Sequence, residues 1–392
     1  MAAYRARIKE FHDVLNEDQI NLKRLKSMCF NGIPDEPGSV RALCWKLILN
    51  YLPLSPSKFL SFLEKQRKLY SSFIQEMIVN PGKQHFGKSG KIDVTFEDHP
   101  LNPNPDSQWV AYFKDNDVLV QIDKDVRRLC PDIGFFQRAT EFPCQDVVNA
   151  AEMETLRKRV DCSVLQSHTV MKNRQGAYNW KSSKKSTVEY DLLPDGKEAH
   201  WEVVERILFI YAKLNPGLAY VQGMNEIIGP IYYIFASDSE REWSEHAECD
   251  AFFCFTNLMS EIRDNFIKSL DDSAHGIGNM MMQLMNRLQL HDPDVGSLMV
   301  TQDLKPQYFS FRWLTLLLSQ EFPMPDVIRV WDSLFADSKR FDFLIDVCLA
   351  MLLLIRDDLL KNDFSSNMKL LQRYPVFDIH LVLSEAVRLQ KS

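Results

Sequence analysis

The chain has 392 residues, of which 45% are hydrophobic and 11% aromatic, so it can bury a sizeable core in one large domain or in two or three average ones. Its net charge of −7 at pH 7 provides no general basic surface, which argues against nucleic acid and anionic membrane as direct partners. The eight cysteines include no C-x-x-C pair and are typical of reduced thiols in a cytoplasmic protein.

Apolar residues with the helical period of 3.6 recur along the whole chain, whereas alternation with a period of two is limited to a short stretch at 91–96. The stretch 201–214 predicts an amphipathic helix that Pro216-Gly217 should end. The stretch 224–235 is apolar nearly all round and predicts a buried helix with a break at Gly229-Pro230. We therefore expect an all-α fold, with further helices at 8–15, 40–51, 57–78, 250–268, 277–289, 308–321, 325–335 and 341–360.

The longest apolar runs, 224–235 and 343–355, are shorter than the roughly 20 residues that a membrane-spanning helix needs, so we expect no transmembrane segment.

Two stretches depart from the helical pattern. Residues 80–108 are rich in glycine and proline and predict a loop, and residues 162–198 mix serine, lysine, asparagine and glycine and predict a long flexible loop insertion.

The segment Gly82–Ser89 fits the phosphate-binding pattern G-x-x-x-x-G-K-[ST], which raises the possibility of an intrinsic nucleotidase. That pattern binds phosphate only between a strand and a helix whose N-terminus faces the ligand. Here a helical pattern precedes the segment and a proline-rich stretch follows it. We interpret the match as coincidental and expect no nucleotide site, and the spacing of the nine histidines predicts no metal site.

The first motif with chemical meaning is I-x-x-D-x-x-R at Ile122–Arg128. On a helical wheel Val126 and Leu129 share the apolar face of Ile122, which places Arg128 on the polar side near Asp125. An arginine offers a planar, permanent positive charge of the kind that phosphoryl transfer uses. The alternative is structural: an arginine near a helix C-terminus can simply complement the helix dipole and pair with Asp125 at i,i+3.

The second motif is Y-x-Q-G-M-N at Tyr220–Asn225, directly after an Asn215-Pro216-Gly217 turn. The Gln222 amide can both donate and accept hydrogen bonds, so it can orient an attacking water. Gly223 would let the backbone come close to another molecule. The alternative is again structural, because a glutamine at this position can satisfy backbone groups at the start of the following helix.

The two motifs occur within a longer ordered series that resembles the TBC domain of Rab GTPase-activating proteins, over about 32–338. The other members of the series are Gly32-Ile33-Pro34, Arg41, Trp45, Arg206–Tyr211, Ala251–Phe255, Phe311-Arg312-Trp313 and Val330-Trp331-Asp332. The resemblance implies an all-helical, two-lobed domain, here with a long loop insertion at about 162–198. Residues 1–31 would then be an N-terminal helical extension, and residues 339–392 would be C-terminal helices packed on the domain.

The resemblance also implies a function and its residues. Arg128 and Gln222 would be two catalytic fingers inserted in trans into a GTP-bound Rab, supported by Ile122, Asp125, Tyr220 and Gly223. GTP and magnesium would be bound by the Rab, so the chain itself would need no cofactor. The protein would regulate vesicle trafficking from the cytoplasm and reach membranes peripherally, through the Rab. The alternative is a non-catalytic effector or scaffold with the same fold, which the presence of both fingers disfavours.

Overall fold

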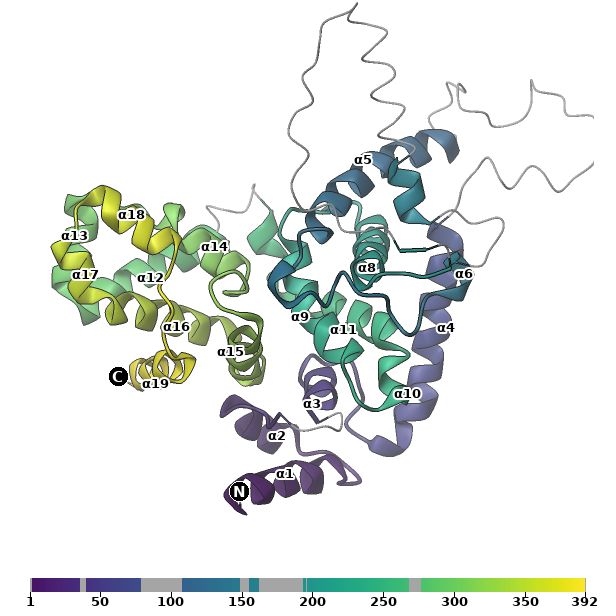
Figure 1. The fold of residues 1–392 in the computed structure, drawn as a ribbon. Coiled ribbons are helices and arrows are strands. Elements are labelled where there is room, and N and C mark those ends of the chain that lie inside the picture. Colours follow the sequence, from purple (N-terminus) through teal and green to yellow (C-terminus); the bar gives the residue numbers. More distant parts are fainter. Residues whose placement is uncertain are drawn as a thin grey trace, which may run out of the picture. The chain divides into compact units, whose positions relative to one another are not determined.

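The computed structural model describes residues 2–35, 40–78, 108–148, 155–161, 193–194, 196–267 and 276–391. Within these ranges the regular elements are helices, and the only β-type pairing is an isolated bridge between Ala139 and Ala199 (Figure 1). The all-α prediction is therefore confirmed. The chain forms two compact units, Met1–Glu64 with Glu226–Ser392, and Lys65–Asn225.

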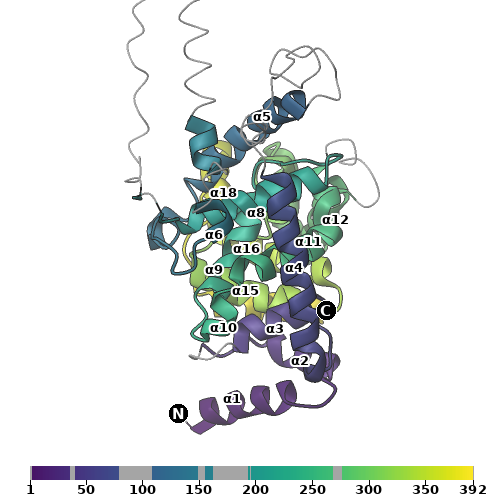
Figure 2. The ribbon, with the colours of Figure 1, turned by 90° about the vertical axis from the view of Figure 1, so that its right-hand side faces the viewer.

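The first unit is organised around α16, whose residues 343–352 are almost all buried. This helix packs against α12, α14, α15 and α19 (Figure 1). Helix α15 packs in addition against α2 and α3 (Figure 2). The helices of this unit are α1 (Ala2–Leu15), α2 (Leu22–Phe30), α3 (Val40–Ile48), α10 (Arg241–Ser244), α11 (Ala247–Ile262), α12 (Ile277–His291), α13 (Pro293–Thr301), α14 (Ser310–Thr315), α15 (Met324–Ala336), α16 (Arg340–Leu354), α17 (Arg356–Lys361), α18 (Phe364–Gln372) and α19 (Ile379–Gln390).

The second unit is built on α8 (His200–Leu214), in which residues 200–212 are all buried. Helix α5 (Gln108–Val126) packs along it, and an ion pair of 2.6 Å between Lys213 and Asp115 joins the two helices. The unit also contains α6 (Gln145–Val148) and a helical segment at 156–161. Two helices cross the division between the units: α4 (Phe59–Met77) and α9 (Met224–Ala236).

Most helices predicted from periodicity are present, with differences at their ends. The helix expected at 308–321 is shorter, because Leu317 and Leu318 have φ values of 50° and 62°, in the left-handed region that a helix cannot accommodate. The predicted break at Gly229-Pro230 is wrong, since α9 continues through Pro230. Proline costs this helix one hydrogen bond, but the buried apolar side chains on either side keep the segment helical.

Several predictions concern residues that the structure does not describe. These are the glycine- and proline-rich loop up to residue 107, the alternating stretch 91–96, the segment Gly82–Ser89, and the insertion from 162 to 192. The expected boundaries at 31/32 and 338/339 also stay predictions.

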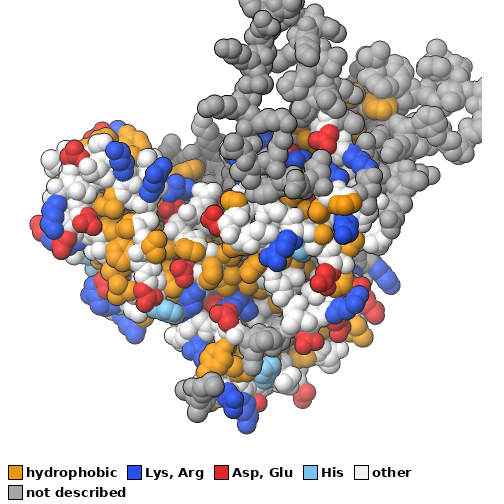
Figure 3. Space-filling view, in the orientation of Figure 1, with side chains coloured by type: hydrophobic (Ala, Val, Ile, Leu, Met, Phe, Trp, Pro, Cys, Tyr) orange, Lys and Arg blue, Asp and Glu red, His pale blue; other side chains and the backbone are white. Residues whose placement is uncertain are grey.

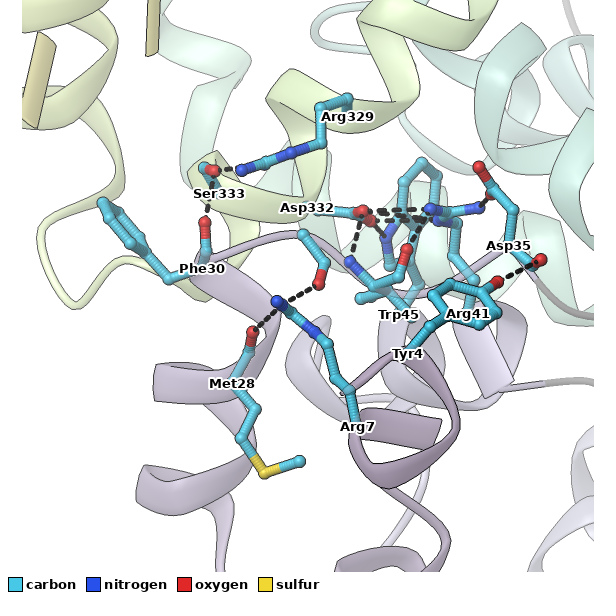
Figure 4. Close-up of polar contacts among 12 residues, drawn as sticks. Tyr4, Arg7, Met28, Phe30, Asp35, Arg41, Trp45, Arg329, Asp332 and Ser333 are labelled. Carbon is cyan, nitrogen blue, oxygen red and sulfur yellow. Dashed lines mark hydrogen bonds and ion pairs between the residues drawn. The ribbon is translucent and has the colours of Figure 1, made fainter. Parts of the chain in front are cut away.

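A buried aspartate on α15 joins segments that lie almost 300 residues apart (Figure 4). Asp332 accepts hydrogen bonds from the backbone N–H of Ile33 at 2.9 Å and from the Trp45 indole at 2.8 Å, and it pairs with Arg41 at 3.3 Å. Burial raises the pKa of Asp332, and the positive charge of Arg41 opposes that rise. Three segments of the ordered series, those around Ile33, Arg41 and Asp332, therefore meet at one carboxylate.

On the described part of the face in Figure 3, acidic and basic side chains are interspersed, which agrees with the absence of a general basic surface inferred from the composition. None of the helices in the described ranges combines the length and the hydrophobicity that a membrane-spanning segment requires.

Candidate functional site

The first motif forms the C-terminal end of α5. The side chains of Ile122, Val126 and Leu129 are fully buried, as the helical wheel predicts. After Val126 the backbone forms a turn with an i,i+3 hydrogen bond, in which the Arg128 N–H donates to the Asp125 carbonyl at 3.2 Å, and Cys130 adopts a φ of 40°. Arg128 thus lies on a tight turn immediately after the helix, with buried neighbours that anchor the turn.

The Arg128 side chain is 69% exposed, whereas its partner Asp125 is only 7% exposed. Its Nη2 donates to Oδ1 of Asp125 at 2.8 Å and its Nε donates to the Lys124 carbonyl at 2.9 Å. The ion pair expected by the structural interpretation is therefore present. Because the guanidinium itself is mostly exposed, this pair does not by itself explain the position of Arg128.

Asp125 is also the residue at which the two motifs meet. Its second oxygen, Oδ2, accepts a hydrogen bond of 2.8 Å from the hydroxyl of Tyr220, which lies 95 residues further along the chain. The Asn225 amide donates to the Asp125 backbone carbonyl at 3.4 Å. Tyr220, Asn225 and Asp125 are all buried. One carboxylate therefore holds the guanidinium of the first motif and the hydroxyl of the second.

Gln222 lies on an exposed turn just before α9. The backbone of the next residue, Gly223, has a φ of 102°, a conformation that favours glycine. The Gln222 side chain makes no hydrogen bond to any residue that the structure describes. The structural alternative, in which the amide satisfies the start of the helix, is therefore not observed, and the amide is exposed to solvent.

The sequence interpretation missed a second group of residues beside the site. Arg127 forms an ion pair with Asp123 at 2.9 Å, and its guanidinium lies 4.8 Å from the ring centre of Trp201 on α8. The Asp123–Arg127 spacing of i,i+4 is visible in the sequence and predicts such a pair. The contact with Trp201 is tertiary, and no sequence pattern indicates it.

Among the residues that the structure describes, no group of three or more histidine, cysteine, aspartate or glutamate side chains could hold a metal ion. The segment with the phosphate-loop pattern, Gly82–Ser89, lies outside those residues.

Comparison with known proteins identifies the family. The Rab-GTPase-TBC domain model matches residues 157–360, a range that includes Gln222 but not Arg128. The chain is 60% identical to TBC1 domain family member 13 of Homo sapiens over 99% of both chains. It is 38% identical to a TBC domain-containing protein of Schizosaccharomyces pombe, over 99% of this chain and 73% of that protein.

A solved structure has the same fold at low sequence identity. The crystal structure of the Ypt/Rab-GAP domain of Gyp1p superposes with a TM-score of 0.68 and 22% identity, over 99% of this chain and 98% of that one. The chain therefore belongs to the Rab-GTPase-TBC domain family.

Proposed function

We propose that this protein is a GTPase-activating protein for a Rab-family small GTPase and that Arg128 and Gln222 are the two side chains it inserts into the Rab's site. Family membership supports the activity. The observation that carries the residue assignment is the position of Asp125, which binds Arg128 through one oxygen and Tyr220, two residues before Gln222, through the other.

Arg128 acts on the charge that develops during phosphoryl transfer. A guanidinium is a planar cation, and that of Arg128 is 69% exposed on the turn after α5, so it can reach into the site of another protein. To do so it exchanges its hydrogen bond to the Lys124 carbonyl for phosphoryl oxygens, while Asp125 continues to orient it. An arginine supplied in trans in this way accelerates hydrolysis by about 10³–10⁵-fold.

Gln222 acts on the attacking water. Its amide oxygen accepts a hydrogen bond from the water and its amide nitrogen donates to the phosphoryl oxygens, which is the role that a GTPase normally gives to its own glutamine. The Tyr220 hydroxyl on the buried Asp125 and the left-handed Gly223 fix the turn on either side of this residue. GTP and magnesium are bound by the Rab, and the chain contributes side chains alone.

The alternative is an effector or scaffold that binds GTP-loaded Rabs without accelerating hydrolysis. Such a protein would need neither an exposed arginine oriented by a buried carboxylate nor an exposed glutamine two residues after the tyrosine that binds the same carboxylate. We therefore favour catalysis. Recruitment to membranes would be peripheral and would follow from binding to the Rab, whose activity in vesicle trafficking the protein would end.

The test is a single-turnover GTP hydrolysis assay with a panel of purified Rabs, using the wild-type protein, Arg128→Ala and Gln222→Ala. We expect both variants to bind the GTP-loaded Rab but to lose at least 10³-fold in stimulated rate. Arg388→Ala is the matched control, because Arg388 is 65% exposed and pairs with Glu385 at i,i+3, as Arg128 does with Asp125, but on α19. Arg128→Ala with the rate of wild type would exclude the assignment, and a protein that binds Rabs but stimulates none would be the scaffold.

A further inference from the structure

The finger is one of two adjacent arginines, and the structure holds them differently. Arg127 is 30% exposed, compared with 69% for Arg128. Its Nε lies 2.9 Å from both carboxylate oxygens of Asp123, which is one turn earlier on α5 and 9% exposed. The Arg127 side chain is therefore held against α5 by Asp123, whereas the Arg128 side chain extends towards solvent.

Arg127 also connects α5 with α8. Its guanidinium lies 4.8 Å from the ring centre of the buried Trp201, a distance at which the positive charge and the ring attract each other. Burial acts to lower the pKa of Arg127, but the charge and hydrogen bonds of Asp123 outweigh it and raise that pKa. The side chain thus stays charged while it stacks on the second helix.

The start of α8 also forms backbone hydrogen bonds with residues 136–140, which follow the turn that contains Arg128. The Trp201 N–H donates to the Phe136 carbonyl at 2.9 Å, and the His200 N–H donates to the Arg138 carbonyl at 3.1 Å. In the opposite direction, the Thr140 N–H donates to the Glu198 carbonyl at 2.8 Å. The segment that contains Arg128 is therefore attached to one short stretch, residues 198–201 at the start of α8, both before and after the turn.

We propose that Arg127 is a positioning residue: through Asp123 and Trp201 it fixes the last turn of α5 to the start of α8 and so determines where the Arg128 side chain begins. This inference rests on the proposed function. It assigns the two arginines distinct tasks, since Asp125 orients the Arg128 side chain whereas Arg127 holds the backbone beneath it. Only arginine can do this fully, because the planar guanidinium bonds the carboxylate at its edge and stacks on the indole with its face.

The predicted consequence is a loss of rate without a loss of binding. A displacement of about 1 Å in a group that acts at the transition state can cost on the order of 10²-fold. We expect Arg127→Met, which keeps the apolar contact with Trp201, to lower the maximal stimulated rate by about 10–100-fold. The Rab concentration that gives half of that rate should change less than about two-fold, because ground-state docking is untouched. Arg127→Lys should recover part of the loss.

Asp123 and Arg127 should also behave as one unit. Asp123→Asn should lower the rate about as much as Arg127→Met, and the double variant should be no worse than either single one. Lys114→Ala is the charge-matched control, because Lys114 is an exposed lysine near the other end of α5. Its rate and its half-saturating Rab concentration should both equal those of wild type.

The experiment measures the single-turnover rate against Rab concentration, together with the melting temperature of each variant and with Arg128→Ala in the same assay. If no Rab is stimulated by the wild-type protein, the proposed function fails, and if Arg128→Ala is as active as wild type, the assignment of Arg128 fails. If Arg128→Ala is inactive and Arg127→Met has the wild-type maximal rate, the positioning role is refuted and the proposed function stands. If Arg127→Met does not fold, Trp201→Phe replaces it, and a wild-type maximal rate in that folded variant likewise refutes the role.

Discussion

The hydrogen bond between Tyr220 and Asp125 can be tested by removing a single oxygen atom. Tyr220→Phe keeps the ring and its packing but leaves Oδ2 of a 7%-exposed carboxylate without its 2.8 Å donor. A hydrogen bond to a charged group contributes about 1.5–3 kcal/mol, compared with about 0.5–1.5 kcal/mol for a bond between neutral groups. We therefore expect Tyr220→Phe to lower the free energy of unfolding by about 1.5–3 kcal/mol.

Tyr374 provides the matched comparison. Its hydroxyl is also buried and donates at 3.0 Å, but to the neutral backbone carbonyl of Met351. Tyr374→Phe should therefore cost only about 0.5–1.5 kcal/mol. Urea denaturation followed by circular dichroism measures the free energy of unfolding of each variant, from the midpoint and slope of the unfolding transition that the substitution shifts. Equal costs for the two substitutions would show that Asp125 is not a charged acceptor at this position.

Three further predictions address other parts of the molecule. If Gln222 orients the water, a Rab whose own catalytic glutamine is replaced should still be stimulated by the wild-type protein but not by Gln222→Ala; loss of stimulation with Gln222 intact would contradict this. Gly32→Ala should lower the melting temperature, because the residue has a φ of 88° and an added Cβ would lie 2.7 Å from Nε of Arg329; an unchanged melting temperature would contradict this. Burial raises the pKa of Glu205 well above its usual range, so the folded state keeps a proton that the unfolded state loses above about pH 4.3. The free energy of unfolding of the wild type, measured relative to Glu205→Gln, should therefore fall as the pH rises from about 4.3 towards the raised pKa, and parallel pH profiles in urea denaturation would exclude this.

The sequence contained enough information for the fold class and for the local ion pair between Asp125 and Arg128. Helical periodicity depends on neighbouring residues, so it predicted most of the long helices, including α8 and α9. The shorter helices α2 and α13 were missed because each spans only nine residues, too few for the helical period to repeat clearly. Both nevertheless begin at readable caps, since Asn21 accepts from the Arg24 N–H at 3.0 Å and Asp292 accepts from the Val295 N–H at 3.1 Å.

What the sequence could not provide is the set of contacts between distant segments. The spacing of I-x-x-D-x-x-R indicates that Asp125 can reach Arg128, but not that its other oxygen binds Tyr220. In the same way, the persistence of α9 through Pro230 depends on burial, which overrides local propensity. Arg127 makes one contact of each kind. Its ion pair with Asp123 can be predicted from the i,i+4 spacing in the sequence, whereas its contact with Trp201 depends on the packing of α5 on α8.

The long separation in sequence between the two motifs is compatible with the contacts at Asp125. Arg128 and Gln222 lie 94 residues apart in the sequence. The entropy of closing a loop grows only with the logarithm of its length, so a doubled spacer costs about 0.6 kcal/mol. The hydrogen bond from Tyr220 to the Asp125 carboxylate contributes more than that, about 1.5–3 kcal/mol. The relative placement of Arg128 and Tyr220 is therefore set by local contacts at Asp125 and along α5 and α8, and the length of chain between them is free to vary.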